Sequence, residues 1–196
     1  MANRSQQQKQ NLSRRSVASL VLLGGALLWL SSRPAPDETP GPAPVAESAP
    51  PAASVDPSAI ARVLTHAGGT LSEPERERIA RAVVRYSAKY ELDTELVTAV
   101  MLVEGRGLPS ARSAKGAMGL MQVMPAMIGP LGMAGNFTTV ESNVEAGCLI
   151  LADNIRRMGE PDGILAYFWG PHIRGDAYLE RVQAARAEVR RILRSS

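Results

Sequence analysis

The feature that most constrains the fold is an almost unbroken apolar run, residues 97–103, which ends in Glu104 and Gly105. A helix formed by this run would be apolar on every side, so it has to be buried in the core of the domain. A carboxyl group at the end of such a helix is either an ordinary helix terminus or a group placed for proton transfer. Burial and the negative end of the helix dipole both disfavour the anion, so we expect a raised pKa for Glu104.

Apolar residues recur at helical spacing on both sides of this run and predict a mainly α-helical domain at residues 58–196. Asp56 and Ser72 are expected to begin the first two helices, and Asp93 the helix that ends at Glu104. The elements expected later in the chain are a helix over residues 143–158, a short apolar segment over 163–169 and a helix over 176–193.

The segment before Pro125 is expected to be extended, because a residue that precedes proline disfavours the α conformation. We therefore expect extended backbone over residues 119–124, with a small β-hairpin around 111–124 as an open alternative. Gly105 and Gly107 are expected to end the preceding helix.

Residues 1–32 have the layout of a cytoplasmic tail followed by a signal sequence or a signal anchor. Arg14 and Arg15 precede the uncharged segment 16–32, whose 17 residues are at the short limit for crossing a bilayer. Positive charge on this side would keep the N-terminus in the cytoplasm and send the rest out. We favour an uncleaved anchor, because no small-residue cleavage site follows at once. Cleavage near residues 46–48 and twin-arginine export stay open.

Residues 33–57 hold eight of the fourteen prolines, mixed with Ala, Ser and acidic residues. Proline lacks a backbone donor and fixes φ, so this segment is expected to be an extended linker without a core of its own. A polyproline II chain rises by about 3.1 Å per residue, which gives a reach of roughly 70 Å. The sequence thus predicts a domain tethered to a membrane segment.

The cysteine and histidine content argues against a metal site. Cys148 is the single cysteine, so no intrachain disulfide forms and no metal site can rest on thiolates. His66 and His172 have no ligand neighbours in the sequence. No metal and no cofactor are therefore expected. The net charge of +3 and the C-terminal arginines are interpreted as a solvated face, and nucleic acid is not expected as a partner.

Several segments, in order, carry a resemblance to a known family. Residues 116–125 read Gly-Ala-Met-Gly-Leu-Met-Gln-Val-Met-Pro, and residues 143–147 read Asn-Val-Glu-Ala-Gly. Residues 166–171 contain Ala-Tyr followed, after two aromatic residues, by Gly-Pro. Together with Glu104 and Ser113, this pattern resembles the catalytic core of soluble lytic transglycosylase (SLT) domains, which have a lysozyme-like fold. The resemblance covers roughly residues 80–185.

The resemblance implies cleavage of the β-1,4 bond between N-acetylmuramic acid and N-acetylglucosamine in peptidoglycan. Glu104 would be the single acid/base, because the C6 hydroxyl of the muramic acid supplies the nucleophile and leaves a 1,6-anhydro end. This agrees with the lack of a second carboxylate close to Glu104 on its own helix. By position, Ser113 and Gln122 would hydrogen-bond the sugar or stabilise the site. Tyr167 would orient or polarise Glu104, and Met121 would belong to the wall of the substrate groove or to the core.

Three positions depart from the family pattern. Gly105 stands where the family usually has Ser, Phe168 and Trp169 stand where it has Asn and a small residue, and Met127 replaces a Thr. These changes motivate two rival hypotheses, namely a non-catalytic domain that binds peptidoglycan or takes part in envelope assembly, and a hydrolytic muramidase. The expected location is the bacterial inner membrane with the domain in the periplasm. The tether suits a partnership with an envelope-spanning secretion or assembly machine, although wall turnover stays open.

Overall fold

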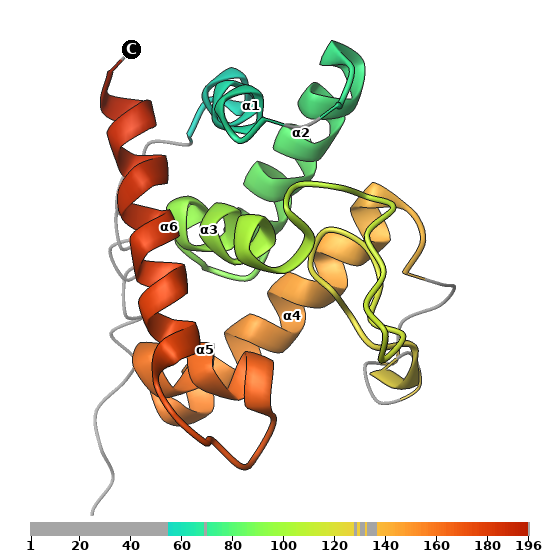
Figure 1. The fold of residues 1–196 in the computed structure, drawn as a ribbon, viewed down its shortest axis with the longest axis vertical. Coiled ribbons are helices and arrows are strands. Elements are labelled where there is room, and N and C mark those ends of the chain that lie inside the picture. Colours follow the sequence, from blue (N-terminus) through green and yellow to red (C-terminus); the bar gives the residue numbers. More distant parts are fainter. Residues whose placement is uncertain (1–54, 69, 128, 130–131, 133–136, 196) are drawn as a thin grey trace, which may run out of the picture. The chain divides into compact units, whose positions relative to one another are not determined.

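The apolar run of the sequence forms the helix α3, which spans Thr94–Gly105 and lies inside the domain (Figure 1). The computed structural model describes residues 55–68, 70–127, 129, 132 and 137–195. Asp93 caps α3, because its Oδ1 accepts the backbone N–H of Glu95 at 2.6 Å and that of Leu96 at 3.3 Å. The side chains of residues 96–101 are all buried, so the predicted burial of α3 on all sides is confirmed.

The described residues form six α-helices and one short 3-10 helix, which confirms the mainly α-helical prediction. In chain order these are α1 (Pro57–His66), α2 (Glu73–Lys89), α3, η1 (Pro125–Met127), α4 (Val140–Met158), α5 (Glu160–Trp169) and α6 (Ala177–Arg194). Helix α1 packs on α2, α2 on α3 and α4, and α4 on α5. Helix α6 passes along the side of the domain and contacts α3, α1 and α5 (Figure 1).

The helix starts follow the expected capping chemistry. Asp56 accepts the N–H of Ser58 at 2.9 Å, and Ser72 and Glu75 form a capping box at the start of α2. Helix α4 begins three residues before the predicted start, because the Thr139 hydroxyl accepts the N–H of Ser142 at 3.1 Å and caps the helix there. The apolar segment predicted over residues 163–169 is the second half of α5.

The core contains apolar side chains from all six helices and from the loop between α3 and α4. Fully or nearly fully buried examples, one from each, are Ile60, Val83, Val100, Leu120, Val144, Ile164 and Val182. Cys148 is also buried, as predicted for a small apolar residue, and this burial raises the pKa of its thiol to about 12. The thiol therefore stays protonated and serves as a packing group.

The prediction of extended backbone before Pro125 is wrong. Residues 119–122 form a turn, in which Gly119 has φ 75° and Gln122 has φ 47°. The turn directs two consecutive side chains, Leu120 and Met121, into the core, where both are fully buried. Extended backbone would point successive side chains to opposite faces and leave one of them outside.

The small β-hairpin that the sequence left open is reduced to isolated pairings. Met118 forms antiparallel bridges with Arg112 and with Val123, and no strand forms within the described part of the chain. Because the turn closes so tightly, the backbone on either side of it pairs at single residues only.

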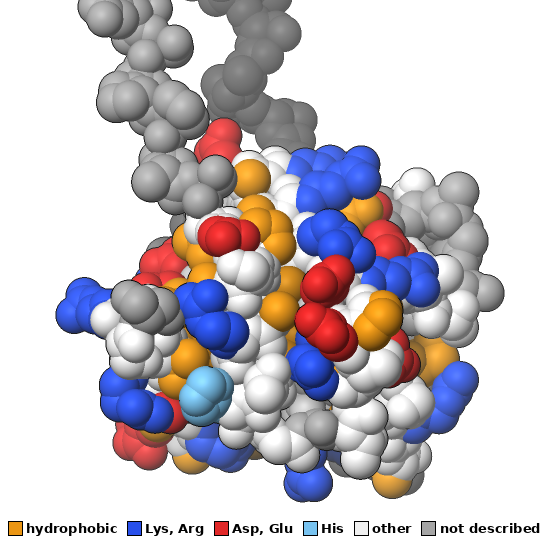
Figure 2. Space-filling view, turned by 90° about the horizontal axis from the view of Figure 1, so that it is seen from above, with side chains coloured by type: hydrophobic (Ala, Val, Ile, Leu, Met, Phe, Trp, Pro, Cys, Tyr) orange, Lys and Arg blue, Asp and Glu red, His pale blue; other side chains and the backbone are white. Residues whose placement is uncertain are grey.

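Ion pairs join the outer faces of the helices. Arg78 of α2 donates to both carboxylate oxygens of Glu141 of α4, at 2.8 and 2.7 Å. Within α2, Arg81 pairs with Glu77 at 3.2 Å. Figure 2 shows the same mixture on one face of the domain, where acidic and basic side chains lie beside one another. Exposed pairs of this kind contribute little each to stability.

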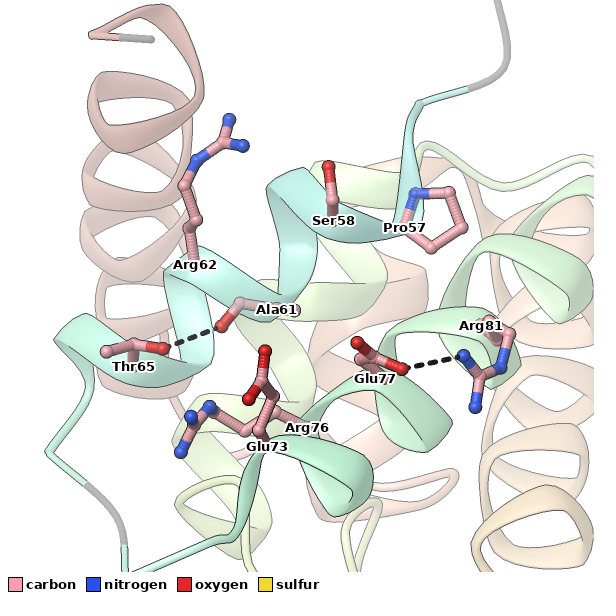
Figure 3. Close-up of a pocket in the computed structure, with 9 residues that line it drawn as sticks. All are labelled: Pro57, Ser58, Ala61, Arg62, Thr65, Glu73, Arg76, Glu77 and Arg81. Atoms are coloured by element: carbon pink, nitrogen blue, oxygen red, sulfur yellow. Dashed lines mark hydrogen bonds and ion pairs between the residues drawn. The ribbon is translucent and has the colours of Figure 1, made fainter.

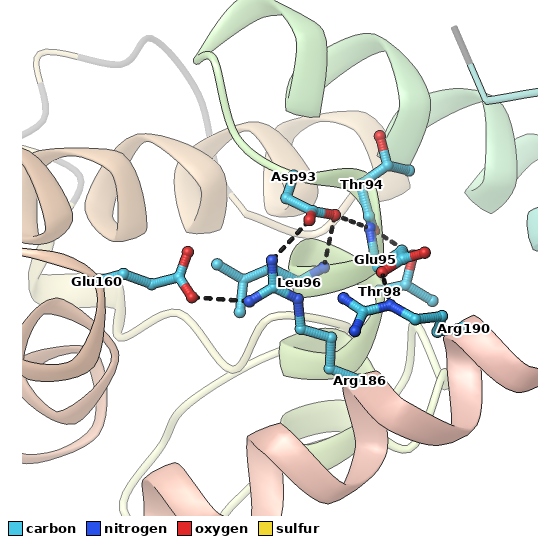
Figure 4. A network of polar contacts seen from close by, with 8 residues as sticks. All are labelled: Asp93, Thr94, Glu95, Leu96, Thr98, Glu160, Arg186 and Arg190. Atoms are coloured by element: carbon cyan, nitrogen blue, oxygen red, sulfur yellow. Dashed lines mark hydrogen bonds and ion pairs between the residues drawn. The ribbon is translucent and has the colours of Figure 1, made fainter. Parts of the chain in front are cut away.

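A more buried polar network fixes the first turn of α3 (Figure 4). Arg186 of α6 donates to Asp93 at 2.6 Å and to Glu160 at the start of α5 at 2.7 Å. One turn further along α6, Arg190 donates to Glu95 at 2.8 Å. Burial acts to raise the pKa of Asp93, but the hydrogen bond and charge of Arg186 and the backbone donors of α3 outweigh it, so the pKa is lowered. Three helices are therefore held together where α3 begins.

The predicted membrane segment, residues 1–32, and the linker up to residue 54 lie outside the described residues. Across the parts that are described, no helix combines the length and the apolar composition needed to cross a bilayer. The described domain begins with Val55 and enters α1 at Pro57, one residue before the predicted boundary.

Candidate active site

Glu104 lies in the last turn of α3 with its carboxyl group half-buried, and its Oε1 accepts a hydrogen bond of 2.7 Å from the Tyr178 hydroxyl. Burial raises the pKa of Glu104, and the Tyr178 hydrogen bond and the positive charge of Arg181 oppose this effect without cancelling it. The predicted direction of the shift is thus confirmed. A carboxyl group with a raised pKa keeps its proton to higher pH, which suits a general acid.

Tyr178 is the functional residue that the sequence reasoning missed. It lies at the start of α6 and is buried, and burial together with the nearby charge of Glu104 raises the pKa of its phenol. The phenol therefore stays protonated and acts as a donor. The sequence does contain a signal, because Tyr178 lies one helical turn before Val182 on the inward face of α6. A tyrosine on an apolar stripe needs a partner for its hydroxyl.

Tyr167, which was predicted to orient or polarise Glu104, donates its hydroxyl to the backbone carbonyl of Met121 at 2.7 Å. Burial raises the pKa of Tyr167 well above its usual range, and the charge of Glu104 adds to this, so the two groups do lie near each other. Tyr167 thus holds the turn beside the carboxyl group, whereas the tyrosine that hydrogen-bonds to Glu104 is Tyr178. The predicted role of Tyr167 stays a prediction.

Asn143 organises the loop between α3 and α4 from within the core. Its side chain is almost fully buried, and Oδ1 accepts the N–H of Met121 at 2.8 Å. Its Nδ2 donates to the carbonyls of Met118 at 2.8 Å and Phe137 at 3.1 Å. A Cβ on Gly119 would lie 2.6 Å from this amide group, so only glycine fits there. The Asn143 side chain therefore serves to satisfy the buried backbone groups of the turn.

Gly105 lets this loop approach the end of α3. A Cβ at Gly105 would lie 2.5 Å from the carbonyl oxygen of Leu120 and 2.7 Å from that of Gly119. Gly105 is the last residue of α3, which agrees with its predicted place at the helix end, and it also provides close packing. The residue that leaves the helical conformation is Arg106, which caps α3 with φ 53° and ψ 29°.

Ser113 and Gln122 both make hydrogen bonds inside the loop. The Ser113 hydroxyl accepts the N–H of Ala117 at 3.0 Å, and the side chain is exposed. The Gln122 amide donates to the carbonyls of Gly119 at 3.0 Å and Ala111 at 3.3 Å. These contacts shape the loop, and the assignment of both residues as sugar ligands stays a prediction.

Met121 lies in the core and not in a groove wall, the two places that the sequence left open for it. Its side chain is fully buried, and a Cβ on Gly147 of α4 would lie 2.5 Å from its Cβ. The side chain is therefore inaccessible to a substrate in this structure. Its backbone, which binds Asn143 and Tyr167, is what links it to the site.

An exposed aromatic group adjoins the Glu104–Tyr178 pair. Phe168 stacks on Tyr178 with ring centroids 4.6 Å apart and an interplanar angle of 14°. Trp169 packs its edge against Phe168 at 4.9 Å, and its indole N–H donates to the Gly175 carbonyl at 3.2 Å. Phe168 is 47% exposed and Trp169 37% exposed, in contrast to the buried Tyr178.

A pocket of about 470 Å³ lies elsewhere, between α1 and α2 (Figure 3). Arg62, Glu73, Arg76 and Glu77 line it, and none of the predicted site residues does. Glu73 and Glu77 are solvent-exposed, and Glu77 pairs with Arg81. This pocket lacks the half-buried carboxyl group that marks the Glu104 site.

A family model described as "Transglycosylase SLT domain" matches residues 81–188, which is more than half of the chain. The chain belongs to this family. The SLT match includes Glu104, the loop after α3, Asn143, Tyr167 and Tyr178, so every residue of the candidate site lies inside it.

Among solved structures, the chain is similar to the X-ray structure of an inactive mutant of lytic transglycosylase Slt from Pseudomonas aeruginosa. The two are 21% identical, with a TM-score of 0.43 over 57% of this chain and 22% of that chain. This SLT chain thus matches less than a quarter of that protein's length. A comparison with curated proteins found no match.

Proposed function

We propose that this SLT domain is a peptidoglycan lytic transglycosylase with Glu104 as its single acid/base. The observation that carries the proposal is the half-buried Glu104 carboxyl group, whose pKa is raised by burial and which Tyr178 holds from α6. Membership of the SLT family supports the choice of peptidoglycan as the substrate.

The proposed reaction uses one carboxyl group twice. Protonated Glu104 gives its proton to the oxygen that links C1 of N-acetylmuramic acid to N-acetylglucosamine, and this C1–O bond breaks. The resulting Glu104 carboxylate then takes the proton of the muramic acid C6 hydroxyl, and O6 forms a bond with C1. The product is a 1,6-anhydro end, and no water is consumed. Tyr178 orients the carboxyl group and stabilises its charge after the first step.

A second candidate is a domain of the same fold that binds peptidoglycan without cleaving it, or a muramidase that uses water. This alternative is motivated by the exposed Phe168 and Trp169, which stand where the family usually has Asn and a small residue. The three activities differ in their products, so a single assay separates them.

The test incubates the full chain, kept in detergent, with purified peptidoglycan and analyses the soluble products by mass spectrometry. Anhydro ends support the transglycosylase, reducing ends the muramidase, and bound but intact glycan the binding domain. Glu104→Gln should abolish release while the protein stays folded. Glu188→Gln, an exposed carboxyl group on α6, is the matched control and should release at the wild-type rate. Wild-type release by Glu104→Gln would overturn the assignment.

We also propose that residues 1–32 anchor the protein in the bacterial inner membrane and that the domain acts in the periplasm. The basic flank and apolar run of the sequence support this proposal. Membrane fractionation combined with intact mass should show a membrane-bound protein of unprocessed length. A shortened, released protein would show a cleaved signal instead.

A further inference from the structure

We propose that Phe168 and Arg181 form a substrate subsite beside Glu104, in which the Phe168 ring binds the apolar face of a sugar and Arg181 binds a carboxylate carried by the same glycan. The substrate class is thus a glycan strand with anionic substituents, such as peptide stems. This proposal rests on the proposed function, since the subsite would align the strand with Glu104.

The apolar half of the subsite is a rigid, exposed ring. One face of Phe168 is covered by Tyr178 at 4.6 Å, and the edge of Trp169 supports it at 4.9 Å. Trp169 is itself held by its hydrogen bond to Gly175. Even with these neighbours, 47% of Phe168 is exposed, so part of the ring is open to a ligand. The carbon–hydrogen face of a pyranose ring is apolar and flat enough to pack on such a surface.

The charged half of the subsite is Arg181 of α6, one turn after Tyr178. Its guanidinium carbon lies 5.7 Å from the Phe168 ring centroid and 5.5 Å from that of Tyr178. These contacts orient the guanidinium group over the rings. The side chain is exposed and forms no ion pair with a carboxylate of the described residues. Its N–H donors are therefore available to an incoming carboxylate, which Arg binds in a bidentate manner.

A chain of direct contacts connects the subsite to the acid. Phe168 stacks on Tyr178, and Tyr178 donates to Glu104. Arg181 lies close enough for its charge to act on the same carboxyl group. Because Tyr178 covers one face of Phe168, a sugar on the free face would be separated from Glu104 by the two stacked rings. It would therefore lie along the strand from the bond that is cleaved, with its anionic substituent near Arg181.

The test measures binding separately from cleavage. The Glu104→Gln variant of the full chain is titrated with glycan strands that carry peptide stems and with the same strands after their carboxylates have been converted to amides. Adding Phe168→Leu should weaken binding of both strands about tenfold, because an apolar residue without a ring loses the stacking contact. Adding Arg181→Gln should weaken binding of the strands with free carboxylates about fivefold and leave the amidated strands unchanged. Arg181→Lys should restore part of the loss, since it keeps the charge but not the bidentate geometry.

Two matched controls come from α2 and from the end of α4. Arg85→Gln removes an arginine with the same 5.5 Å placement over a tyrosine ring, and Met158→Ala removes an exposed apolar side chain that is 38% exposed. Neither should alter binding. Unchanged binding by Phe168→Leu with an unchanged melting temperature would overturn the sugar platform. Equal weakening of both strands by Arg181→Gln would overturn the carboxylate contact. These binding measurements do not depend on cleavage, so they can be interpreted even if the wild-type protein binds glycan without cleaving it. Failure of the subsite can therefore be told apart from failure of the proposed function.

Discussion

The Tyr178 hydroxyl donates a 2.7 Å hydrogen bond to Glu104 Oε1, although the two residues are 74 positions apart in the chain. Glu104 ends α3 and Tyr178 begins α6, so the contact exists only when these two helices have packed together. The hydrogen bonding of the proposed acid, Glu104, therefore depends on the packing of α6 against α3.

Tyr178→Phe should shift the pH dependence of peptidoglycan release. The Tyr178 hydrogen bond lowers the pKa of Glu104, so its removal raises that pKa further. Because Glu104 must be protonated to act as an acid, the alkaline limb of the rate profile should move to higher pH. The maximal rate should fall about tenfold, since a hydrogen bond to a charged group is worth roughly 1.5–3 kcal/mol. An unchanged profile would show that the contact does not act on the acid.

Glu104→Gln should raise stability at neutral pH. In the folded state the pKa of Glu104 is raised above its unfolded value, so ionisation of the carboxyl group destabilises the native state as pH rises through this interval. The gain should be on the order of 1 kcal/mol at pH 7.5 and should shrink toward pH 4.5. Melting temperatures at both pH values test this. In Glu188→Gln, where the lost carboxyl group has a lowered pKa, no such gain should occur.

Gly105→Ser should disturb the site, although serine is the residue that the family usually has here. The added Cβ would meet the carbonyl oxygens of Leu120 and Gly119 at 2.5 and 2.7 Å, and neither backbone group can turn away. We expect a loss of about 1–3 kcal/mol in the free energy of unfolding, together with slower release. Urea denaturation measures the first. Gly129→Ser, at a loop glycine with open space around its Cβ position and no positive φ, tests whether crowding rather than loss of any loop glycine is responsible.

Asn143→Ala should be among the most destabilising single changes in the domain. It removes the partners of one backbone N–H and two backbone carbonyls, all in or near the core. Buried groups without partners cost about 1–3 kcal/mol each, so a total loss of about 3 kcal/mol is expected. Calorimetry should show a melting temperature lower by roughly 10 °C. Asn154→Ala, at another buried asparagine of α4, is the control, and an equal loss there would argue against a special role for Asn143.

Arg186→Ala should loosen the start of α3 in a pH-dependent way. The pKa of Asp93 is lowered in the folded protein, so its carboxylate contributes stability above its unfolded pKa and loses it as pH falls through the folded value. The variant should lose about 2 kcal/mol at pH 7, and the difference from wild type should narrow below about pH 4. Arg191→Ala, whose exposed pair with Glu188 lies on the same helix, should leave the stability nearly unchanged at both pH values.

The helices follow from the sequence because their signals are local. Asp56 and Asp93 cap the helices as expected, and the apolar run of α3 is buried on all sides. The turn after α3 does not follow, because it depends on a partner 22 residues away, the Asn143 side chain that accepts the Met121 N–H. The rule for the residue before proline concerns Met124 and does not reach residues 119–122, where tertiary packing sets the turn.

The candidate site was predictable to the same extent. The end of an apolar helix left Glu104 open between a helix terminus and an acid, and the resemblance of the segments that follow pointed to the acid. Burial shifts its pKa in the expected direction. The choice between two tyrosines does not follow, because the sequence does not show which of Tyr167 and Tyr178 faces the carboxyl group. The structure assigns Tyr167 to the Met121 carbonyl and Tyr178 to Glu104.

Helix α6 contacts both ends of α3. Tyr178 donates to Glu104 in the last turn of α3, and Arg186 donates to Asp93, which caps its first turn. A helix turns by about 100° and advances 1.5 Å for each residue. Because Arg186 follows Tyr178 by eight residues, the direction and the separation of their side chains fix how α6 lies against α3. If one residue were added or removed between Tyr178 and Arg186, the two side chains could not both reach their partners on α3. The number of residues between Tyr178 and Arg186 is therefore more strictly constrained than the identity of the exposed side chains among them.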